Sequence, residues 1–223
     1  MERTAVLIPS YNEAKTIGGI VERLKKGGAN VYVVDDGSAD ETAREAASRG
    51  AIVITHAVNK GKGASLREGF AAIMKDGYDH ILVIDGDGQH HLEDIGNFAS
   101  AIDEPGVGIV IGSRMSDTRR MPLERIIVNK MMSLVISKMA GQRIPDTQCG
   151  FRLIKRQVLE GIRLDSSNYE MESELLIKAA HNGWKIRSVP IRTIYQDEAS
   201  RIHPVKDTLR FLALIFRLMF SGR

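Results

Sequence analysis

The chain has 223 residues, of which 43% are hydrophobic and 26% charged, with a formal net charge of +3. This length suits one well-buried α/β domain and is short for two. A single cysteine excludes an intramolecular disulfide, no leader precedes the first apolar run, and no apolar run approaches the roughly 20 residues of a membrane span. We therefore expect a cytoplasmic protein that contacts a membrane, if at all, peripherally on the cytoplasmic face.

Short apolar runs rich in Val, Ile and Leu alternate with longer amphipathic stretches through the first part of the chain. The expected strands are residues 5–9, 31–35, 51–55, 80–85 and 107–112. The expected helices between them are residues 14–26, 40–48, 64–75 and 92–102. This alternation indicates βαβ units in a largely parallel sheet, and the continuous apolar strands indicate that helices cover both of its faces.

The rhythm changes after Gly112, where a loop containing several arginines follows. The later expected elements are a helix at 123–139, a strand near 151–154, a helix at 170–181, an extended run at 185–195 and a helix at about 205–220. Because no linker interrupts the chain, we predict one domain over residues 1–223. Within it we expect a nucleotide-binding half at 1–115, an acceptor half at 116–203 and a C-terminal amphipathic helix at 204–223.

Polar clusters stand where four of the expected strands end. These clusters are residues 9–13, 35–38, 85–89 and 112–114. Ligands of open α/β sheets bind beyond the carboxyl ends of the strands. Each cluster alone has a purely structural explanation, but together the four predict one site at this edge of the sheet.

Asp85 and Asp87 flank a glycine directly after a buried-looking strand. In a tight turn two such carboxylates can converge on one divalent cation, and Mg²⁺ or Mn²⁺ is typically held by one or two carboxylates plus substrate phosphate oxygens. Gln89 offers a further neutral oxygen. A solvated turn would also explain the triplet, and the strand before it is what favours a metal site.

Two adjacent acids end the second expected strand. Asp40 is expected to cap the following helix, which leaves Asp36 to hydrogen-bond a base or a ribose. Residues 59–63, Asn-Lys-Gly-Lys-Gly, include Lys62 and precede a helix N-terminus, which makes a corner suited to anions. They lack the spacing of a Walker P-loop, and a lysine-rich surface turn explains them equally well.

The later motifs carry weaker signals when each is taken alone. Cys149 has no His and Asn partners in the sequence that would make it a nucleophile, so we expect a buried small residue. Glu170 and Glu172 stand in the first turn of an expected helix, where acids interact favourably with the helix dipole.

In this order, the motifs resemble glycosyltransferase family 2. The matching segments of the first half are residues 9–13, 34–38, 59–63, 85–89 and 112–114. The segments 146–152, 174–176, 189–191 and 200–202 are similar to the branch that transfers mannose or glucose to dolichyl or polyprenyl phosphate. The resemblance spans essentially the whole chain, and although each motif is weak, the ordered set is specific.

The resemblance implies a GT-A fold, with a mostly parallel sheet and a Rossmann-like half that binds a nucleotide sugar. The residues that it places around the nucleoside are Pro9, Tyr11, Glu13 and Asp36. The residues that it places at the metal and the diphosphate are Asp85, Asp87 and Gln89. The arginines that we expect at the acceptor phosphate are Arg114, Arg125 and Arg201. The implied reaction is a metal-dependent, inverting hexosyl transfer from a UDP- or GDP-hexose to a polyprenyl phosphate.

A lipid phosphate is already anionic and can attack the anomeric carbon without a strong protein base. The task of the enzyme is then to neutralise the leaving diphosphate and the repulsion between two anionic substrates. A hydroxyl acceptor would need a base, and Asp146 is the first candidate for it.

Three alternatives remain at this point. One is a family 2 transferase that acts on a soluble sugar or a protein hydroxyl. Another is a nucleotidyltransferase, although the residues after the first strand are Tyr11, Asn12 and Glu13 rather than a basic glycine-rich loop. The third is a nucleotide-sugar-binding protein, which would not need the arginines. No nucleic-acid partner is expected.

The expected C-terminal helix has the pattern of an interfacial helix. Lys206, Arg210 and Arg217 share one face beside bulky apolar residues, and the run is too short to span a bilayer. Packing on the core or on another subunit explains the same pattern equally well. An acceptor whose phosphate lies at a membrane surface favours membrane docking.

Overall fold

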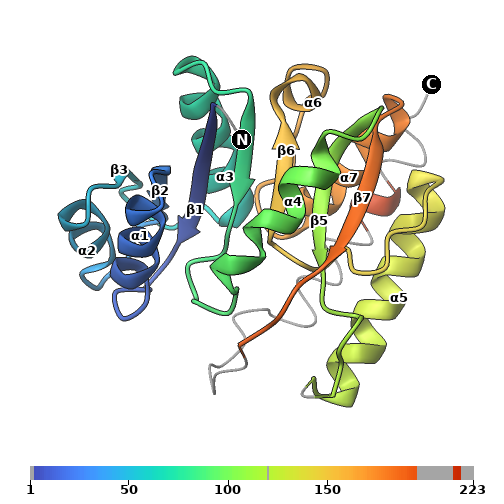
Figure 1. The fold of residues 1–223 in the computed structure, drawn as a ribbon, viewed down its shortest axis with the longest axis horizontal. Coiled ribbons are helices and arrows are strands. Elements are labelled where there is room, and N and C mark those ends of the chain that lie inside the picture. The colour runs from blue at the N-terminus through green and yellow to red at the C-terminus, as the bar shows by residue number, and fades with distance from the viewer. Residues whose placement is uncertain (1–2, 120, 195–212, 217–223) are drawn as a thin grey trace.

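The computed structural model describes residues 3–119, 121–194 and 213–216 (Figure 1). Its strands are β1 (Thr4–Ser10), β2 (Asn30–Asp35), β3 (Ile52–Thr55), β4 (His80–Val83), β5 (Val107–Ser113), β6 (Arg152–Lys155) and β7 (Lys185–Pro190). Its helices are α1 (Ile17–Lys26), α2 (Thr42–Ser48), α3 (Lys62–Lys75), α4 (Ile95–Ile102), α5 (Leu123–Ala140), α6 (Arg156–Glu160) and α7 (Glu170–His181), with a 3-10 turn η1 (Leu92–Asp94). The predicted strands, and the predicted helices up to α7, are all present, and α6 is an element that the sequence pattern did not predict.

All seven strands join one sheet in the order β3-β2-β1-β4-β6-β5-β7. The strand β6 runs antiparallel to β4 and β5, and the other neighbouring strands are parallel. This confirms the mostly parallel α/β sheet. A four-residue strand carries no sequence signal of its direction, so the reversal of β6 could not be predicted. Its consequence is that the chain enters β6 at the edge where the parallel strands end.

Helices cover both faces of the sheet, which explains why the central strands are apolar throughout. In Figure 1, α4 lies in front of the sheet, while α3 and α7 lie behind it. Contacts agree with this view, because α3 packs on β1 and β2, α4 packs on β5 and β7, and α7 packs on β7. The long helix α5 packs against α7 at the side of the molecule.

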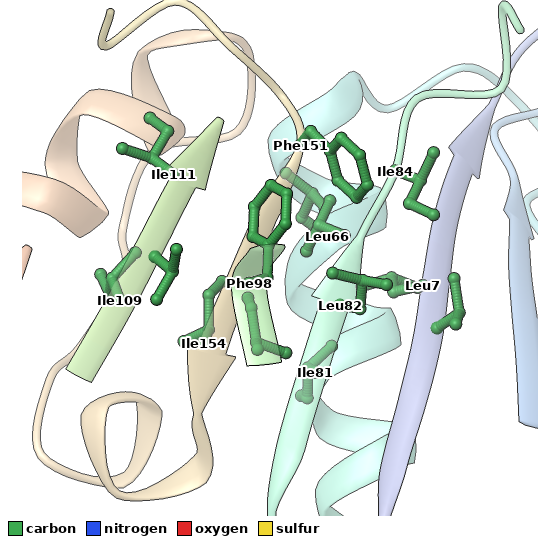
Figure 2. Packing of buried hydrophobic residues seen from close by; sticks show 14 of the residues in the cluster. Leu7, Leu66, Ile81, Leu82, Ile84, Phe98, Ile109, Ile111, Phe151 and Ile154 are labelled. Atoms are coloured by element: carbon green, nitrogen blue, oxygen red, sulfur yellow. The ribbon is translucent and has the colours of Figure 1, made fainter. Parts of the chain in front are cut away.

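The hydrophobic core reaches the edge of the sheet where the predicted site lies (Figure 2). Phe98 of α4 and Phe151, which directly precedes β6, stack with ring centroids 4.4 Å apart. The ring of His90 also packs on Phe151, with ring centroids 5.0 Å apart. Apolar packing therefore fixes the start of β6 and the polar residues beside it.

Several predicted boundaries differ from the structure. The strand β4 ends at Val83 rather than at residue 85, and the extended run after residue 185 ends as a strand at Pro190. Glu41 stands at the N-cap position of α2, one residue after the predicted Asp40, but it makes no side-chain capping bond, and the side chain that caps the first N–H of the helix is that of Asp40. Asp40 accepts hydrogen bonds from the N–H groups of Thr42 (3.0 Å) and Ala14 (3.1 Å), which ties the start of α2 to the loop after β1.

Most of the predicted C-terminal helix lies outside the described residues, and so does Arg201. The described residues 213–216 are helical, with Leu214 buried and Phe216 exposed. Among the residues with described structure, no helix combines the length and the apolar character needed to cross a membrane.

We predict that Phe98→Ala lowers the free energy of unfolding by about 3–5 kcal/mol, because it removes a fully buried ring from between two layers. Urea denaturation followed by circular dichroism measures the change. Ile127→Ala, at an exposed position, is the control and should change stability by less than about 0.5 kcal/mol. A loss of less than about 1 kcal/mol at Phe98 would show that the site does not depend on this packing.

Candidate active site

The strand pairing brings the predicted polar clusters to one edge of the sheet. Ser10 at the end of β1 pairs with Asp35 at the end of β2, and Ser113 at the end of β5 pairs with Pro190. The chain leaves β4 into the turn that contains Asp85, and the first residue of β6, Arg152, pairs with Val83. The four clusters from the first half of the chain therefore line the same edge as the segment that enters β6.

The loop after β1 is fixed by side chains of the loop after β2. The N–H of Asn12 donates to Ser38 Oγ (2.8 Å), and the N–H of Glu13 donates to Thr42 Oγ1 (2.7 Å). Asn12 has a φ of 53°, a conformation that Asn tolerates better than most residues. These bonds tie the loop that carries Tyr11 and Glu13 to the loop after β2 and to the start of α2, at the edge where the sequence predicts a nucleoside.

Asp36 is buried and uses its carboxylate inside the protein. Its oxygens accept hydrogen bonds from the N–H groups of Lys60 and Gly61, both at 2.8 Å, and Oδ1 lies 2.6 Å from His56 Nδ1. The other ring nitrogen of His56 lies 2.8 Å from Glu68 Oε2. Both oxygens are therefore already engaged inside the protein, and the expected bond from Asp36 to a base or ribose stays a prediction. The Asp36 carboxylate shapes the loop that precedes α3.

That loop delivers Lys62, the first residue of α3, to the centre of the site. Lys62 Nζ lies 2.7 Å from Asp85 Oδ1 and 3.0 Å from Glu172 Oε2. Burial would lower the pKa of Lys62, but the charges on Asp85 and Glu172 outweigh it and raise this pKa above its ordinary value. Lys62 is therefore charged at neutral pH.

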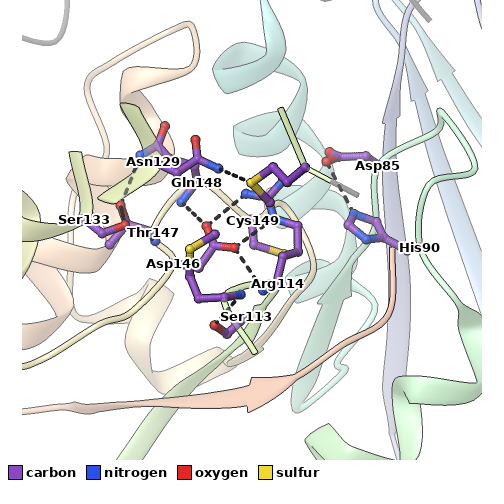
Figure 3. A network of polar contacts seen from close by, with 12 residues as sticks. Asp85, His90, Ser113, Arg114, Asn129, Ser133, Asp146, Thr147, Gln148 and Cys149 are labelled. Carbon is purple, nitrogen blue, oxygen red and sulfur yellow. Dashed lines mark hydrogen bonds and ion pairs between the residues drawn. The ribbon is translucent and has the colours of Figure 1, made fainter. Parts of the chain in front are cut away.

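His90 lies near the other oxygen of Asp85, with Nε2 3.6 Å from Oδ2 (Figure 3). Burial would raise the pKa of Asp85, but Lys62 and His90 together lower it well below its usual range. Asp87 differs, because burial and the charge on Asp85 both raise the pKa of Asp87. Its Oδ1 accepts a hydrogen bond from the N–H of Gln89 (2.9 Å), which closes the turn.

The residues of this turn fit a divalent cation. Asp85 and Asp87 are two carboxylates close enough for the charge on one to disfavour ionisation of the other, which a bound cation would relieve. The buried Ser10 Oγ faces Gly86 and has no hydrogen-bond partner among the described residues. The described part of the chain holds no cluster of three or more His, Cys, Asp or Glu side chains placed for a metal. A cation here would therefore take its remaining ligands from other groups, namely the side-chain oxygen of Gln89, a substrate or water.

The segment that enters β6 passes directly beside Asp85. A methyl group on Gly150 would collide with the Asp85 carboxylate, so only glycine allows this approach. Arg152, two residues after Gly150, is almost fully buried. Its guanidinium donates to the carbonyl oxygens of Cys149 (2.9 Å), Thr147 (2.9 Å) and Glu172 (3.0 Å). Arg152 therefore joins this segment to the start of α7.

Arg114 and Asp146 form a bidentate ion pair (Figure 3). Arg114 Nε donates to Asp146 Oδ2 (2.8 Å) and Nη2 donates to Oδ1 (2.9 Å). The N–H groups of Arg114 (3.1 Å) and Gln148 (3.2 Å) donate to the same carboxylate, which is fully buried. Four donors therefore engage this carboxylate and fix the orientation of the Arg114 side chain, and the role of Asp146 as a base for a hydroxyl acceptor stays a prediction.

Other predicted residues lie less directly at the site. Pro9 is buried within β1 and pairs with Val34, and Arg125 lies partly buried in the first turn of α5. Cys149 is buried as expected, and burial raises its pKa to about 12, so it is unreactive as a thiolate near neutral pH. The contacts expected of Arg125 and Arg201 with a substrate stay predictions.

Sequence reasoning missed the roles of His56, Glu68 and Arg152 and took Glu172 only for an acid in a helix first turn. A general signal for them exists, because an acid at a buried strand end requires a cationic or hydrogen-bonding partner. The sequence does not say which of the many candidate partners the fold brings near. Only the sheet order and the docking of α7 supply that information.

Comparison with known proteins identifies a family and several relatives that resemble this chain. Residues 5–163 match the family model described as glycosyl transferase family 2. Polyprenol monophosphomannose synthase from Mycolicibacterium smegmatis is 33% identical, with 85% of this chain and 77% of the relative covered. A UDP-N-acetylglucosamine–dolichyl-phosphate N-acetylglucosaminyltransferase from Methanococcus voltae is 32% identical, with 86% of each chain covered.

Solved structures agree on the fold. Glucosyl-3-phosphoglycerate synthase from Mycobacterium tuberculosis, in complex with Mn²⁺, UDP and phosphoglyceric acid, superposes with a TM-score of 0.69. The match covers 98% of this chain and 77% of that chain at 19% identity. At this identity the likeness establishes a shared GT-A architecture and nothing about the substrates of this chain.

We predict that Asp36→Asn lowers the free energy of unfolding by about 2 kcal/mol, because it weakens bonds to a charged acceptor that hold His56 and the loop before α3. Chemical denaturation measures the change. Asp103→Asn, at an exposed position, is the matched control and should leave stability unchanged. If the two variants were equally stable, Asp36 would not organise the loop. Binding of a nucleoside would then be the remaining role for its carboxylate.

Proposed function

Because the chain belongs to glycosyl transferase family 2, we propose that it transfers a hexose from a UDP- or GDP-hexose to a polyprenyl-type lipid phosphate, with inversion at the anomeric carbon. The observation that carries this proposal is the turn of Asp85 and Asp87 at the end of β4, with the cations Lys62 and Arg114 from two other elements at the same edge. Such an arrangement suits substrates that bring phosphate groups and a divalent cation.

In this proposal Asp85 and Asp87 hold Mg²⁺ or Mn²⁺ jointly with the oxygens of the donor diphosphate, and Gln89 contributes its side-chain oxygen. The bound cation would stabilise the negative charge that develops on the leaving nucleoside diphosphate. Tyr11 and Glu13 line the nucleoside corner, where Pro9 contributes the rigid end of β1. The Mn²⁺ and UDP of the synthase from M. tuberculosis are consistent with this choice of ligands.

The chemical identity of the acceptor is the more specific part of the proposal. Arg114 is held by Asp146 in a fixed orientation and would make charge-assisted bonds to a phosphate, with Arg125 and Arg201 as further candidates. Asp146, the acid that a hydroxyl acceptor would need first, is committed to Arg114. This favours an acceptor that is already anionic. The two relatives named for polyprenol and dolichyl phosphate support the same class.

A lipid acceptor requires contact with a membrane surface, and α5 offers one among the described residues. Leu123, Ile127, Met131 and Leu134 recur at helical spacing, and each is more than half exposed. Lys130 and Lys138 are also exposed on this helix. Apolar residues beside lysines are typical of a helix lying in the interface of an anionic membrane. We propose that this face of α5, together with the expected helix at 204–223, docks on the cytoplasmic leaflet.

We predict that Asp87→Asn lowers turnover at least about a hundredfold, equivalent to roughly 2.7 kcal/mol of barrier. The physical reason is the loss of one of the two carboxylates that hold the cation. Transfer of label from a radioactive nucleotide sugar into organic-extractable product measures it, with polyprenyl phosphate as acceptor. Asp103→Asn, exposed and remote from the turn, is the control.

Two other outcomes of the same assay would contradict parts of the proposal. Full activity of Asp87→Asn, or of the native chain in excess EDTA, would remove the metal assignment. Transfer into water-soluble product alone would leave a family 2 glycosyltransferase but would replace the lipid acceptor with a soluble one.

We predict that replacing Ile127 and Leu134 together with Ser at least halves cosedimentation with anionic liposomes, because two large apolar side chains leave the interface. Replacing Ile52 and Val58, which are exposed near β3, with Ser is the matched control and should have no effect. Binding should weaken at high salt, since each basic residue near an anionic leaflet contributes about 1 kcal/mol.

The exposed apolar face of α5 could instead contact a second copy of the chain. Size-exclusion chromatography of the same variants tests this alternative. A native dimer that becomes a monomer when Ile127 and Leu134 are replaced, with liposome binding unchanged, would show that α5 contacts a second copy of the chain.

A further inference from the structure

Four charged side chains of alternating sign connect elements from both halves of the chain. Arg152 Nη2 lies 3.5 Å from Glu172 Oε1, Glu172 Oε2 lies 3.0 Å from Lys62 Nζ, and Lys62 Nζ lies 2.7 Å from Asp85 Oδ1. The four side chains are between 2% and 25% exposed. Each charge is therefore compensated mainly by its neighbour in the row rather than by solvent.

Lys62 has a different relation to each of its two carboxylates. Glu172 is held in place from behind by Arg152, which contacts both its carboxylate and its main-chain carbonyl oxygen. Asp85 stands in the turn after β4 and is the carboxylate that the proposed cation must share. An ammonium 2.7 Å from Asp85 and a divalent cation bound to the same carboxylate would repel each other strongly.

The position of Lys62 allows it to leave one carboxylate and keep the other. It begins α3, after Gly61, whose φ of 94° sets the direction of the chain into the helix. A lysine has a flexible four-carbon stem and a compact ammonium with three donors, so a small rotation changes its partners. The contact with Glu172 limits how far the ammonium can travel.

We propose that Lys62 is a tethered counter-ion of the donor site. It neutralises Asp85 until a divalent cation and a nucleoside diphosphate arrive together. It then releases Asp85, stays anchored to Glu172 and turns its ammonium to the diphosphate. This rests on the metal assignment of the proposed function, and it adds that Lys62 opposes binding of the cation alone while favouring binding of the cation with the nucleotide.

The test measures Mn²⁺ binding by the full chain, with free Mn²⁺ followed by electron paramagnetic resonance. Titrations are made without nucleotide and with saturating UDP or GDP in turn. Lys62→Met keeps the length of the side chain and removes its charge. We expect its affinity for Mn²⁺ alone to rise about tenfold, and the gain in Mn²⁺ affinity caused by the nucleotide to shrink about tenfold.

Two further variants are controls for the expected changes in the affinity for Mn²⁺. Lys60→Met removes a lysine two residues earlier, whose half-exposed side chain lies 3.9 Å from Glu68, and it should leave both affinities unchanged. Glu172→Gln removes the charge that anchors Lys62, so Asp85 becomes the main ionic partner of the lysine. The affinity for Mn²⁺ without nucleotide should therefore fall. The opposite signs for Lys62→Met and Glu172→Gln would not arise from a merely structural lysine.

Circular dichroism establishes that each variant is folded. The proposal is overturned if Lys62→Met binds Mn²⁺ alone no better than the native chain while the native chain shows nucleotide-dependent Mn²⁺ binding. If Lys62→Met fails to fold, Glu172→Gln decides: weaker binding of Mn²⁺ alone supports the proposal, and unchanged or tighter binding overturns it.

Failure of the proposed function has a different signature from failure of this inference. Native protein that binds no Mn²⁺ even with UDP or GDP removes the metal assignment and the counter-ion role together. Mn²⁺ binding with the expected signs, but without transfer to polyprenyl phosphate, removes only the lipid acceptor.

Discussion

The compensation of one partly buried carboxylate governs the arrangement of the whole site. Asp85 follows a strand that is covered on both faces, and its side chain is only 25% exposed, so an isolated charge there would be costly. Lys62 from the start of α3 supplies positive charge beside one of its oxygens, and the ring of His90, from the turn after β4, lies 3.6 Å from the other oxygen. Lys62 in turn needs Glu172 from α7, and Glu172 needs Arg152 from β6. The charge of Asp85 is thus balanced by a row of side chains that fixes α3, β6 and α7 relative to β4.

The reversed strand β6 is what makes this row possible. If β6 ran parallel to β4, its first residue would lie at the opposite edge of the sheet, and the segment before it could not reach Asp85. The reversal instead brings Gly150 against Asp85 and Asp146 against Arg114 at the end of β5. The stacked rings of Phe98 and Phe151 anchor this segment in the core. Apolar packing and charge compensation therefore act on the same few residues at the start of β6.

Much of the fold follows from patterns that are local in the sequence, whereas the site depends on distant pairings. Strands and helices up to α7 are readable because apolar periodicity and turn residues act over a few positions. The gathering of Tyr11, Asp85 and Arg114 at one edge follows from the rule that parallel strands end together. The partners of Asp36 and Asp146 do not follow from any local pattern. Both acids looked available for chemistry, and in the structure both are engaged by donors from other segments. Burial at a strand end obliges an acid to have such partners, but the sequence alone does not identify them.

The pairing of acids with cations also limits the chemistry that the site can support. Asp85, Glu172 and Asp146 each face a lysine or an arginine, and Asp36 faces His56. These contacts give each of the four acids a basic side chain to hold in place. Asp87 is the exception, because burial and the charge on Asp85 raise its pKa, and a divalent cation would remove the cause of that rise. The proposed lipid phosphate brings its own negative charge, and its oxygen would react without any proton transfer.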